Sequence, residues 1–207
     1  MWMIQKITSW ILAILLPSSC YLCHKEGAAL CETCIGLRMR SYDSPSPVIL
    51  TLYSFKDEKI KRIIHAIKYF HRKDLIAPLV TPVTQELRSK NLTNFILVPI
   101  PMPQLRKYMR GYNHSEAIAH ELSIQTLLPV NTTLLQRNSS IKRQVLTRSR
   151  KERLKNQHNA FTVKENVHGM NILLVDDVTT TGATLLEARK KLIEKGAARV
   201  EALALAH

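Results

Sequence analysis

The sequence holds few acidic side chains for its number of basic ones. Its 207 residues include 16 Asp and Glu against 30 Lys and Arg, which gives a formal net charge of +14 with neutral histidines. This charge favours a polyanionic partner, because contacts to a phosphate backbone release counterions and thereby drive binding. Two other interpretations stay open, since the charge also aids solubility and suits a small phosphorylated substrate.

Long hydrophobic runs, internal repeats and low-complexity tracts are also absent. The apolar stretch over residues 1–16 is shorter than the ~20 residues of a membrane-spanning helix. With Lys6 ahead of the run it could pass for a signal peptide, and Cys20 behind it suggests a lipoprotein, but the intervening Pro-Ser-Ser matches a lipid-attachment box poorly. Apolar residues recur there at helical spacing: Ile4, Ile7, Ile11, Ile14 and Leu15. We therefore expect an amphipathic helix over residues 1–16, with a role at a membrane surface as the alternative.

Cysteine is scarce, and its four copies form two pairs of equal spacing. Cys20 and Cys23 make one C-x-x-C pair, and Cys31 and Cys34 make the other. Two such pairs supply the four thiolates of a closed tetrahedral zinc site, which has no open position for chemistry. The spacing therefore predicts a structural zinc module over residues 17–40. Disulfides are the alternative, although nothing else in the chain is typical of a secreted protein.

Apolar strands alternate with amphipathic helices along the rest of the chain. Strands are expected over residues 48–55, 95–100, 172–175 and 200–205. Helices are expected over residues 57–70, 76–87, 113–127 and 184–195. Gly196 would cap the last helix, and the lysines of the first should face outward. This order predicts an α/β domain over residues 48–207, with a parallel sheet flanked by helices and ligands at the carboxyl ends of its strands.

The stretch from Asn171 to Thr184 (NILLVDDVTTTGAT) contains the strongest site pattern. An apolar strand stops at two carboxylates, Asp176 and Asp177, and a loop rich in threonine leads into a helix. N–H groups of such a loop and of the first helical turn bind phosphate, and the helix dipole favours negative charge there. Because carboxylates repel phosphate, the acid pair must hold sugar hydroxyls or a Mg²⁺ ion bridged to a pyrophosphate. The alternative is an ordinary strand-turn-helix with a Thr-rich cap.

This stretch resembles the phosphoribosyl pyrophosphate (PRPP) signature of type I phosphoribosyltransferases. The resemblance implies that Asp176 and Asp177 serve catalysis and a Mg²⁺ ion that comes with PRPP. It implies that the ribose 5-phosphate is bound by Thr179, Thr180, Thr181, Gly182, Ala183 and Thr184. Basic side chains beside a proline-rich loop are candidates to contact the pyrophosphate. They are Arg106, Lys107 and above all Arg110.

Two further blocks extend the resemblance to the ComF/GntX family of competence proteins. Val98 to Asn113 (VPIPMPQLRKYMRGYN) is similar to that family's VPVP…RGFN block. Arg137 to Phe161 is similar to its block with a glutamine, arginines and a closing Asn-Ala-Phe. The sequence departs from the family pattern at Tyr112 and His114, which replace the usual Phe and Gln.

The ComF/GntX resemblance implies a type I phosphoribosyltransferase-like domain behind a zinc-binding hood. It also implies a role in natural transformation, the uptake of single-stranded DNA, together with a helicase-like motor protein. The protein would be cytoplasmic, with peripheral association at the inner membrane as a variant of that prediction.

A strongly basic segment lies between these blocks and the acid pair. It offers contacts to a nucleic-acid backbone through Lys142, Arg143, Arg150 and Arg153. The alternative is a loop that closes over PRPP, and one segment can do both.

Three functions stay open from the sequence. The first is a competence-associated protein that handles incoming single-stranded DNA and has a PRPP or phosphate site. The second is an active phosphoribosyltransferase of nucleotide salvage, for which the sequence shows neither an acceptor pocket nor an identifiable general base. The third is a PRPP-sensing regulator that binds duplex DNA, which no helix-turn-helix signature supports.

Overall fold

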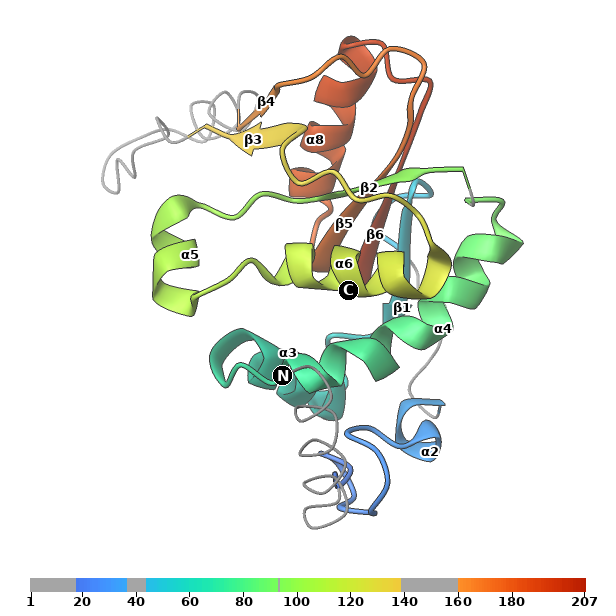
Figure 1. Ribbon diagram of the computed structural model, residues 1–207, viewed down its shortest axis with the longest axis vertical. Coiled ribbons are helices and arrows are strands. Elements are labelled where there is room, and N and C mark those ends of the chain that lie inside the picture. The colour runs from blue at the N-terminus through green and yellow to red at the C-terminus, as the bar shows by residue number, and fades with distance from the viewer. Residues whose placement is uncertain (1–17, 37–43, 93, 139–159) are drawn as a thin grey trace, which may run out of the picture.

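A four-stranded parallel sheet forms the centre of the fold (Figure 1). The computed structural model describes residues 18–36, 44–92, 94–138 and 160–207. The strand order is β1-β6-β5-β2, and each neighbouring pair is parallel. The strands are β1 (Ile49–Tyr53), β2 (Ile96–Pro99), β5 (Asn171–Val178) and β6 (Arg199–Ala206). The predicted strands and their parallel arrangement are confirmed, with one correction: β5 does not stop at the two carboxylates but continues through them.

Alternate residues of β5 face two separate hydrophobic cores. Leu173 and Val175 lie in the core shared with helices α3 (Glu58–Tyr69), α4 (Ile76–Ser89) and α6 (His114–Thr126). Ile172 and Leu174 lie in the core shared with α8 (Ala183–Glu194). Successive side chains of a strand point to opposite faces, so a strand covered on both sides must be apolar throughout. Figure 1 shows the two groups of helices on opposite sides of the sheet.

Side-chain caps fix where two of these helices begin. The carboxylate of Asp57 accepts hydrogen bonds from two N–H groups in the first turn of α3. The side-chain oxygen of Asn113 accepts one from the first turn of α6. Beyond α8 the chain turns at Gly196, whose φ is +92°. The predicted helices and this C-terminal cap are confirmed, because four helices lie within two residues of the predicted bounds.

Three short elements have no readable signal in the sequence. They are helix α5 (Gln104–Arg110) and two antiparallel strands, β3 (Leu135–Arg137) and β4 (Phe161–Val163). No residue of α5 is buried, so this helix has no apolar stripe to detect. Strands of three residues are too short for alternation to stand out from chance.

The cysteine-rich segment packs against the same core as α3 and α4. Cys20, Leu30 and Ile35 are buried in that core, and the last of them belongs to the short helix α2 (Glu32–Gly36). Within the described ranges, no helix is both long and apolar enough to cross a membrane. The predicted amphipathic helix over residues 1–16 lies outside the described residues.

The turn between β5 and α8 depends on a glycine. Gly182 is the N-cap of α8 and has a φ of +73°. A Cβ atom at this position would lie 2.7 Å from Cδ1 of Ile49, a residue that is only 2% exposed. The backbone conformation and the lack of space therefore both require glycine.

Replacing Gly182 with alanine should destabilise the protein by about 2–5 kcal/mol. About 1–2 kcal/mol of this arises from the positive φ, and about 1–3 kcal/mol from overpacking against Ile49. Gly169→Ala is the matched control, because Gly169 has the same φ of +73° but no atom within 4 Å of its added Cβ. Urea unfolding of both variants separates the two effects, and equal losses would show that the contact with Ile49 yields without cost.

Candidate functional site

The acid pair lies at the carboxyl end of β5, which is an inner strand of the sheet. Asp176 still pairs in register with Ala204 of β6, and Val178 with Ala206. The N–H of Thr179 then donates to the carbonyl of Ala206 at 3.0 Å, so the loop starts from a fixed point. Ligands of open parallel sheets bind outside this end of the strands, as predicted for the chain.

The threonine loop leaves its N–H groups and hydroxyls open on one side. Thr179 is buried, and its hydroxyl oxygen accepts from the N–H of Gly182 at 3.1 Å, which closes the loop. The exposed residues that follow are Thr180, Thr181, Ala183 and Thr184. The N-cap residue of α8, Gly182, has no side chain to cap the helix, and the N–H of Ala183 donates only a long hydrogen bond, of 3.4 Å, to the hydroxyl of Thr181. This arrangement can bind an anion, with Thr179 in a structural role.

Asp177 is held by an ion pair that the helical pattern does not reveal. The ammonium of Lys68, in the last turn of α3, lies 2.9 Å from Oδ2 of Asp177. The Lys68 side chain is 18% exposed and that of Asp177 is 15% exposed, so the pair is mostly screened from water. The other carboxylate oxygen, Oδ1, accepts from the N–H of Val178 at 2.6 Å. The expectation that the lysines of this helix face outward is therefore wrong for Lys68.

Asp176 is held by different partners, and its own surroundings raise its pKa. Its Oδ1 accepts from the hydroxyl of Ser115 at 2.8 Å and from the N–H of Asp177 at 2.9 Å. Burial and the charge of Asp177 raise the pKa of Asp176 to about 7, and these hydrogen bonds offset only part of the rise. Near neutral pH this carboxyl therefore exists in both protonation states.

A histidine is buried next to the acid pair. His114, the first residue of α6, is 0% exposed, and its Nδ1 lies 3.8 Å from Oδ2 of Asp177. Neither ring nitrogen has a hydrogen-bond partner among the described residues. Burial lowers the pKa of His114 to about 4, with the charges of Arg110 and Lys68 acting in the same direction and that of Asp177 against it. The ring is therefore neutral at physiological pH.

Three arginines bring positive charge to this end of the sheet. Arg110, at the end of α5, donates to the hydroxyl of Tyr69 at 3.0 Å and lies close enough to His114 to affect its pKa. Arg137 lies on β3; burial and the charge of Arg106 lower its pKa, and the carboxylate of Asp176 opposes them. The structure thus brings Arg110 to the predicted site. The predicted contacts to nucleic acid lie outside the described residues: Lys142, Arg143, Arg150 and Arg153.

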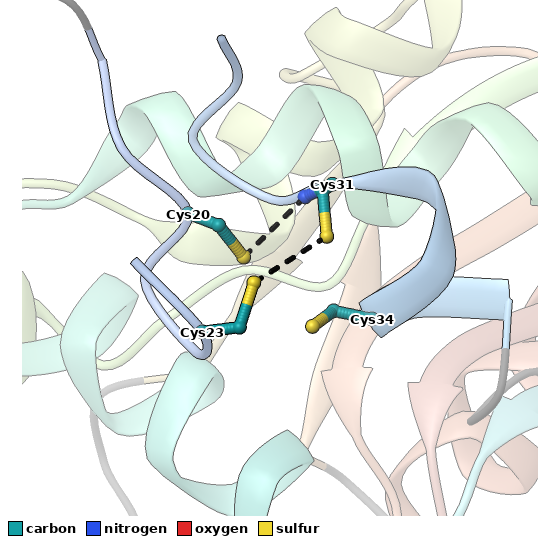
Figure 2. Close-up of side chains that lie close together, drawn as sticks. All are labelled: Cys20, Cys23, Cys31 and Cys34. Carbon is teal, nitrogen blue, oxygen red and sulfur yellow. Dashed lines mark hydrogen bonds between the residues drawn. The ribbon is translucent and has the colours of Figure 1, made fainter. Parts of the chain in front are cut away.

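The four cysteines converge on one point (Figure 2). Their sulfur atoms all lie within 4.8 Å of one another, and no pair forms a disulfide. The sulfurs of Cys23 and Cys31 are 3.7 Å apart, close to the ~3.8 Å between two thiolates at ~2.3 Å from a tetrahedral ion. The N–H of Cys31 also donates to the sulfur of Cys20 at 3.5 Å. This cluster can bind a structural metal ion.

The residues that hold the acid pair in place have no clear signal in the sequence. Lys68 belongs to a helix with several lysines, and helical periodicity does not distinguish which of them turns inward. Ser115 and His114 directly follow the block that ends at Asn113, so a site role for them could have been suspected from their position alone. A buried neutral histidine has no signature in a sequence.

Comparison with protein families matches residues 85–207 to the phosphoribosyl transferase domain. This match and the helix-covered parallel sheet define the class of the protein. The competence protein ComFC of Bacillus subtilis (strain 168) is 30% identical over 203 residues, which cover 94% of this chain and 76% of that protein. The chain therefore belongs to the ComF family of phosphoribosyltransferase-like proteins.

Other relatives have names that refer to DNA. The DNA utilization protein YhgH of Salmonella typhi is 32% identical over 152 residues, which cover 67% of this chain and 63% of that protein. The chain thus spans less than two thirds of the length of that relative. Competence protein F of Haemophilus influenzae (strain ATCC 51907 / DSM 11121 / KW20 / Rd) is 30% identical over 112 residues, 53% of this chain and 49% of that protein.

Solved structures resemble the fold at low identity. An allosteric regulatory enzyme of purine biosynthesis is 17% identical with a TM-score of 0.44, covering 68% of this chain and 30% of that chain. The hypoxanthine phosphoribosyltransferase of Trypanosoma cruzi is 13% identical with a TM-score of 0.37, covering 70% of this chain and 66% of that chain. Values this low identify neither a substrate nor an activity.

Replacing Asp176 with asparagine should remove a pH dependence of stability. The native carboxyl has a pKa raised from 3.8 to about 7, so between these values the folded state binds more protons than the unfolded state. Stability is therefore lost as pH rises through this window. Asparagine mimics the protonated form and should be the more stable residue at pH 8, by up to about 4 kcal/mol.

Urea unfolding of both proteins at pH 5 and pH 8 measures this effect. Asp74→Asn is the control, because the hydrogen bonds and charge of Arg72 lower the pKa of Asp74 below 3.8, and its stability should therefore show the same dependence on pH between 5 and 8 as that of the wild type. That pairing stabilises the protein above the unfolded pKa and is lost as pH falls. Parallel pH profiles for the wild type and Asp176→Asn would contradict the raised pKa.

Proposed function

We propose that this protein handles incoming single-stranded DNA during natural transformation and binds a ribose phosphate at the end of β5. The observation that carries the proposal is the acid pair beside an uncapped helix N-terminus, in a chain related to proteins named for competence and DNA utilization. The net charge of +14 supports an anionic strand as the partner. On this proposal the protein acts in the cytoplasm, at the periphery of the inner membrane, together with a helicase-like motor protein.

The small ligand proposed for the site is PRPP or a related ribose phosphate. Its 5-phosphate would bind the loop from Thr180 to Thr184 and the first-turn N–H groups of α8. Asp176 and Asp177 would face the sugar hydroxyls, while Arg110 and Arg106 supply positive charge for a pyrophosphate. Asp176 and Asp177 would help to hold a Mg²⁺ ion that comes with PRPP, and the ion would neutralise charge on the pyrophosphate.

An active phosphoribosyltransferase is the second candidate, and the family match over residues 85–207 favours it. Among the groups at the site, Asp176 is the best matched to a proton transfer, because its pKa of about 7 lies near the working pH. His114 is unsuited to that role, since it is fully buried and has a pKa of about 4. Pyrophosphate release from PRPP across a panel of acceptors distinguishes a transferase from a protein that only binds the ligand.

Zinc is the ion that we propose for the cysteine cluster. Four thiolates in two C-x-x-C pairs suit its tetrahedral preference and leave no open coordination position. The cluster is far from the acid pair in the sequence, and it packs on the core of α3 and α4. The ion would therefore stabilise the fold and take no part in chemistry.

Single-stranded DNA should bind this protein with an affinity that falls steeply with salt and that PRPP changes. The physical reason is that phosphate contacts release counterions, while the sugar-phosphate site lies beside the basic groups. Fluorescence anisotropy of a labelled oligonucleotide, with and without Mg²⁺–PRPP, measures both effects. Asp177→Asn should reduce the effect of PRPP, because residue 177 then loses the charge that pairs with Lys68 and would face the sugar.

A duplex of the same sequence serves as the control for that experiment. The proposal requires weaker binding to the duplex than to the single strand. Equal or tighter binding to the duplex would favour the regulator hypothesis instead. No binding to either form at low salt would refute the proposed DNA partner and leave the transferase as the function to test.

Replacing Cys31 with serine should remove the bound zinc and lower the melting temperature and solubility together. With only three thiolates the cluster should bind the ion less tightly. The free energy of metal binding that stabilised the folded state is then lost. Zinc content per chain and thermal unfolding measure the two quantities. Ser19→Ala is the control, because Ser19 is exposed beside Cys20 and offers no thiol, and it should leave both quantities unchanged. A zinc-free protein with an unaltered melting temperature would count against a structural metal.

A further inference from the structure

The ends of helices α3 and α5 expose an unusual number of aromatic side chains. Tyr69 is 51% exposed, Phe70 is 64% exposed and Tyr108 on α5 is 89% exposed. We call His65, Tyr69, Phe70 and Arg110 the aromatic platform. Large aromatic side chains bury 150–250 Å² each when they are covered, so leaving several of them in water forgoes considerable stabilisation. A function at this surface explains why they stay exposed.

The rings of the platform are held in place by one another and by a guanidinium group. The His65 ring lies 4.5 Å from that of Tyr69 and 5.6 Å from that of Phe70, measured between ring centroids. The guanidinium of Arg110 lies 5.0 Å from the centre of the Tyr69 ring and donates to its hydroxyl at 3.0 Å. These contacts link α3 to α5 and limit the motion of the rings. A flat partner would meet a surface that is already organised.

The platform is continuous with the ribose-phosphate site. Lys68 comes directly before Tyr69 in α3, and its ammonium reaches Asp177 at 2.9 Å. Arg110 is near enough to His114 to lower its pKa, and His114 lies against the acid pair. A ligand that covers the platform would therefore have its neighbouring sugar or phosphate close to Asp177.

The chemistry of the platform selects one class of partner. Exposed rings suit the flat faces of nucleobases, and the guanidinium suits a phosphate or the face of a base. Duplex DNA keeps its bases stacked inside the helix, so only unpaired bases can reach such a surface. An apolar protein surface would also cover the rings. Its binding would not be strengthened by the guanidinium of Arg110 over the Tyr69 ring or by the net charge of +14.

We propose that the aromatic platform of His65, Tyr69, Phe70 and Arg110 stacks unpaired bases of a single strand and places its backbone at the acid pair. This rests on the proposed function, and it assigns to the described part of the chain a binding surface outside the basic segment of residues 142–153. It also gives the base-recognition element for which the sequence shows no pocket. The ligand at the site is then a nucleotide within or at the end of a strand.

The test compares Phe70→Ala with the exposed-apolar control Ile124→Ala, a residue of α6 that is 71% exposed. Anisotropy titrations use a labelled oligothymidine at several salt concentrations. Phe70→Ala should weaken binding about 5- to 100-fold while the salt dependence stays unchanged, because stacking releases no counterions. Arg110→Gln should reduce the slope of log K against log salt by about 1. The control variant should bind as the wild type does.

An abasic strand of the same length tests stacking directly. Wild-type protein should bind it more weakly than the oligothymidine, and Phe70→Ala should cause no further loss on that strand. Isothermal titration with PRPP, which has no base, should give the same affinity for Phe70→Ala and wild type, and so shows that the variant is folded.

The outcomes separate this inference from the function on which it rests. If the wild type binds no single strand, the proposed function fails. If the wild type binds but Phe70→Ala behaves like Ile124→Ala, or loses equal affinity for the abasic strand, the platform is not a stacking surface and the inference alone is overturned. A third outcome is a wild type that sediments as a dimer and a Phe70→Ala variant that sediments as a monomer with unchanged DNA binding. That outcome would assign the platform to a protein contact and would also overturn the inference.

Discussion

The ion pair between Lys68 and Asp177 is the interaction on which the arrangement of the site depends. It joins the last turn of α3 to the end of β5 across 2.9 Å, in a place where both side chains are mostly buried. Removing one partner of such a pair leaves an uncompensated charge and costs on the order of 3 kcal/mol. Helix α3 in turn contacts the cysteine-rich segment, where the guanidinium of Arg62 lies 5.8 Å from the centre of the Tyr21 ring. The acid pair, α3 and the cysteine cluster are thus parts of one connected structure.

The same ion pair resolves an apparent conflict in the sequence. Two adjacent carboxylates should repel the phosphate ligand that we propose for the neighbouring threonine loop. In the structure Asp177 is compensated by Lys68, and the raised pKa of Asp176 leaves that group only partly charged near neutral pH. His114 adds no charge because its pKa is lowered to about 4. The site therefore presents hydrogen-bonding oxygens with much less negative charge than the sequence implies, as a sugar ligand would require.

Much of the fold could be read from the sequence because its signals are local. The apolar runs that form β1, β2, β5 and β6, the caps at Asp57 and Asn113, and the glycine after α8 all act through neighbouring residues. The cysteine spacing and the stretch from Asn171 to Thr184 identified the cysteine cluster and the acid pair for the same reason. Contacts across long sequence separations could not be read. Ser115 reaches Asp176 over 61 positions, and Arg110 meets Tyr69 over 41, so only the folded chain shows that they meet.

The β3–β4 pairing determines where the basic segment of residues 139–159 is attached. The N–H of Asn138 donates to the carbonyl of Ala160 at 2.9 Å, so the two ends of that segment are tied together. Arg137, at one of these ends, lies close enough to Asp176 for their charges to interact. On the proposed function, a DNA strand bound by that segment would be tethered to β3 and β4, and its further contact with the acid pair would become intramolecular. The effective concentration of DNA phosphate at the threonine loop would then depend on the length of that segment rather than on the amount of DNA in solution. Lengthening the segment would dilute the ligand locally without altering a contact in the sheet.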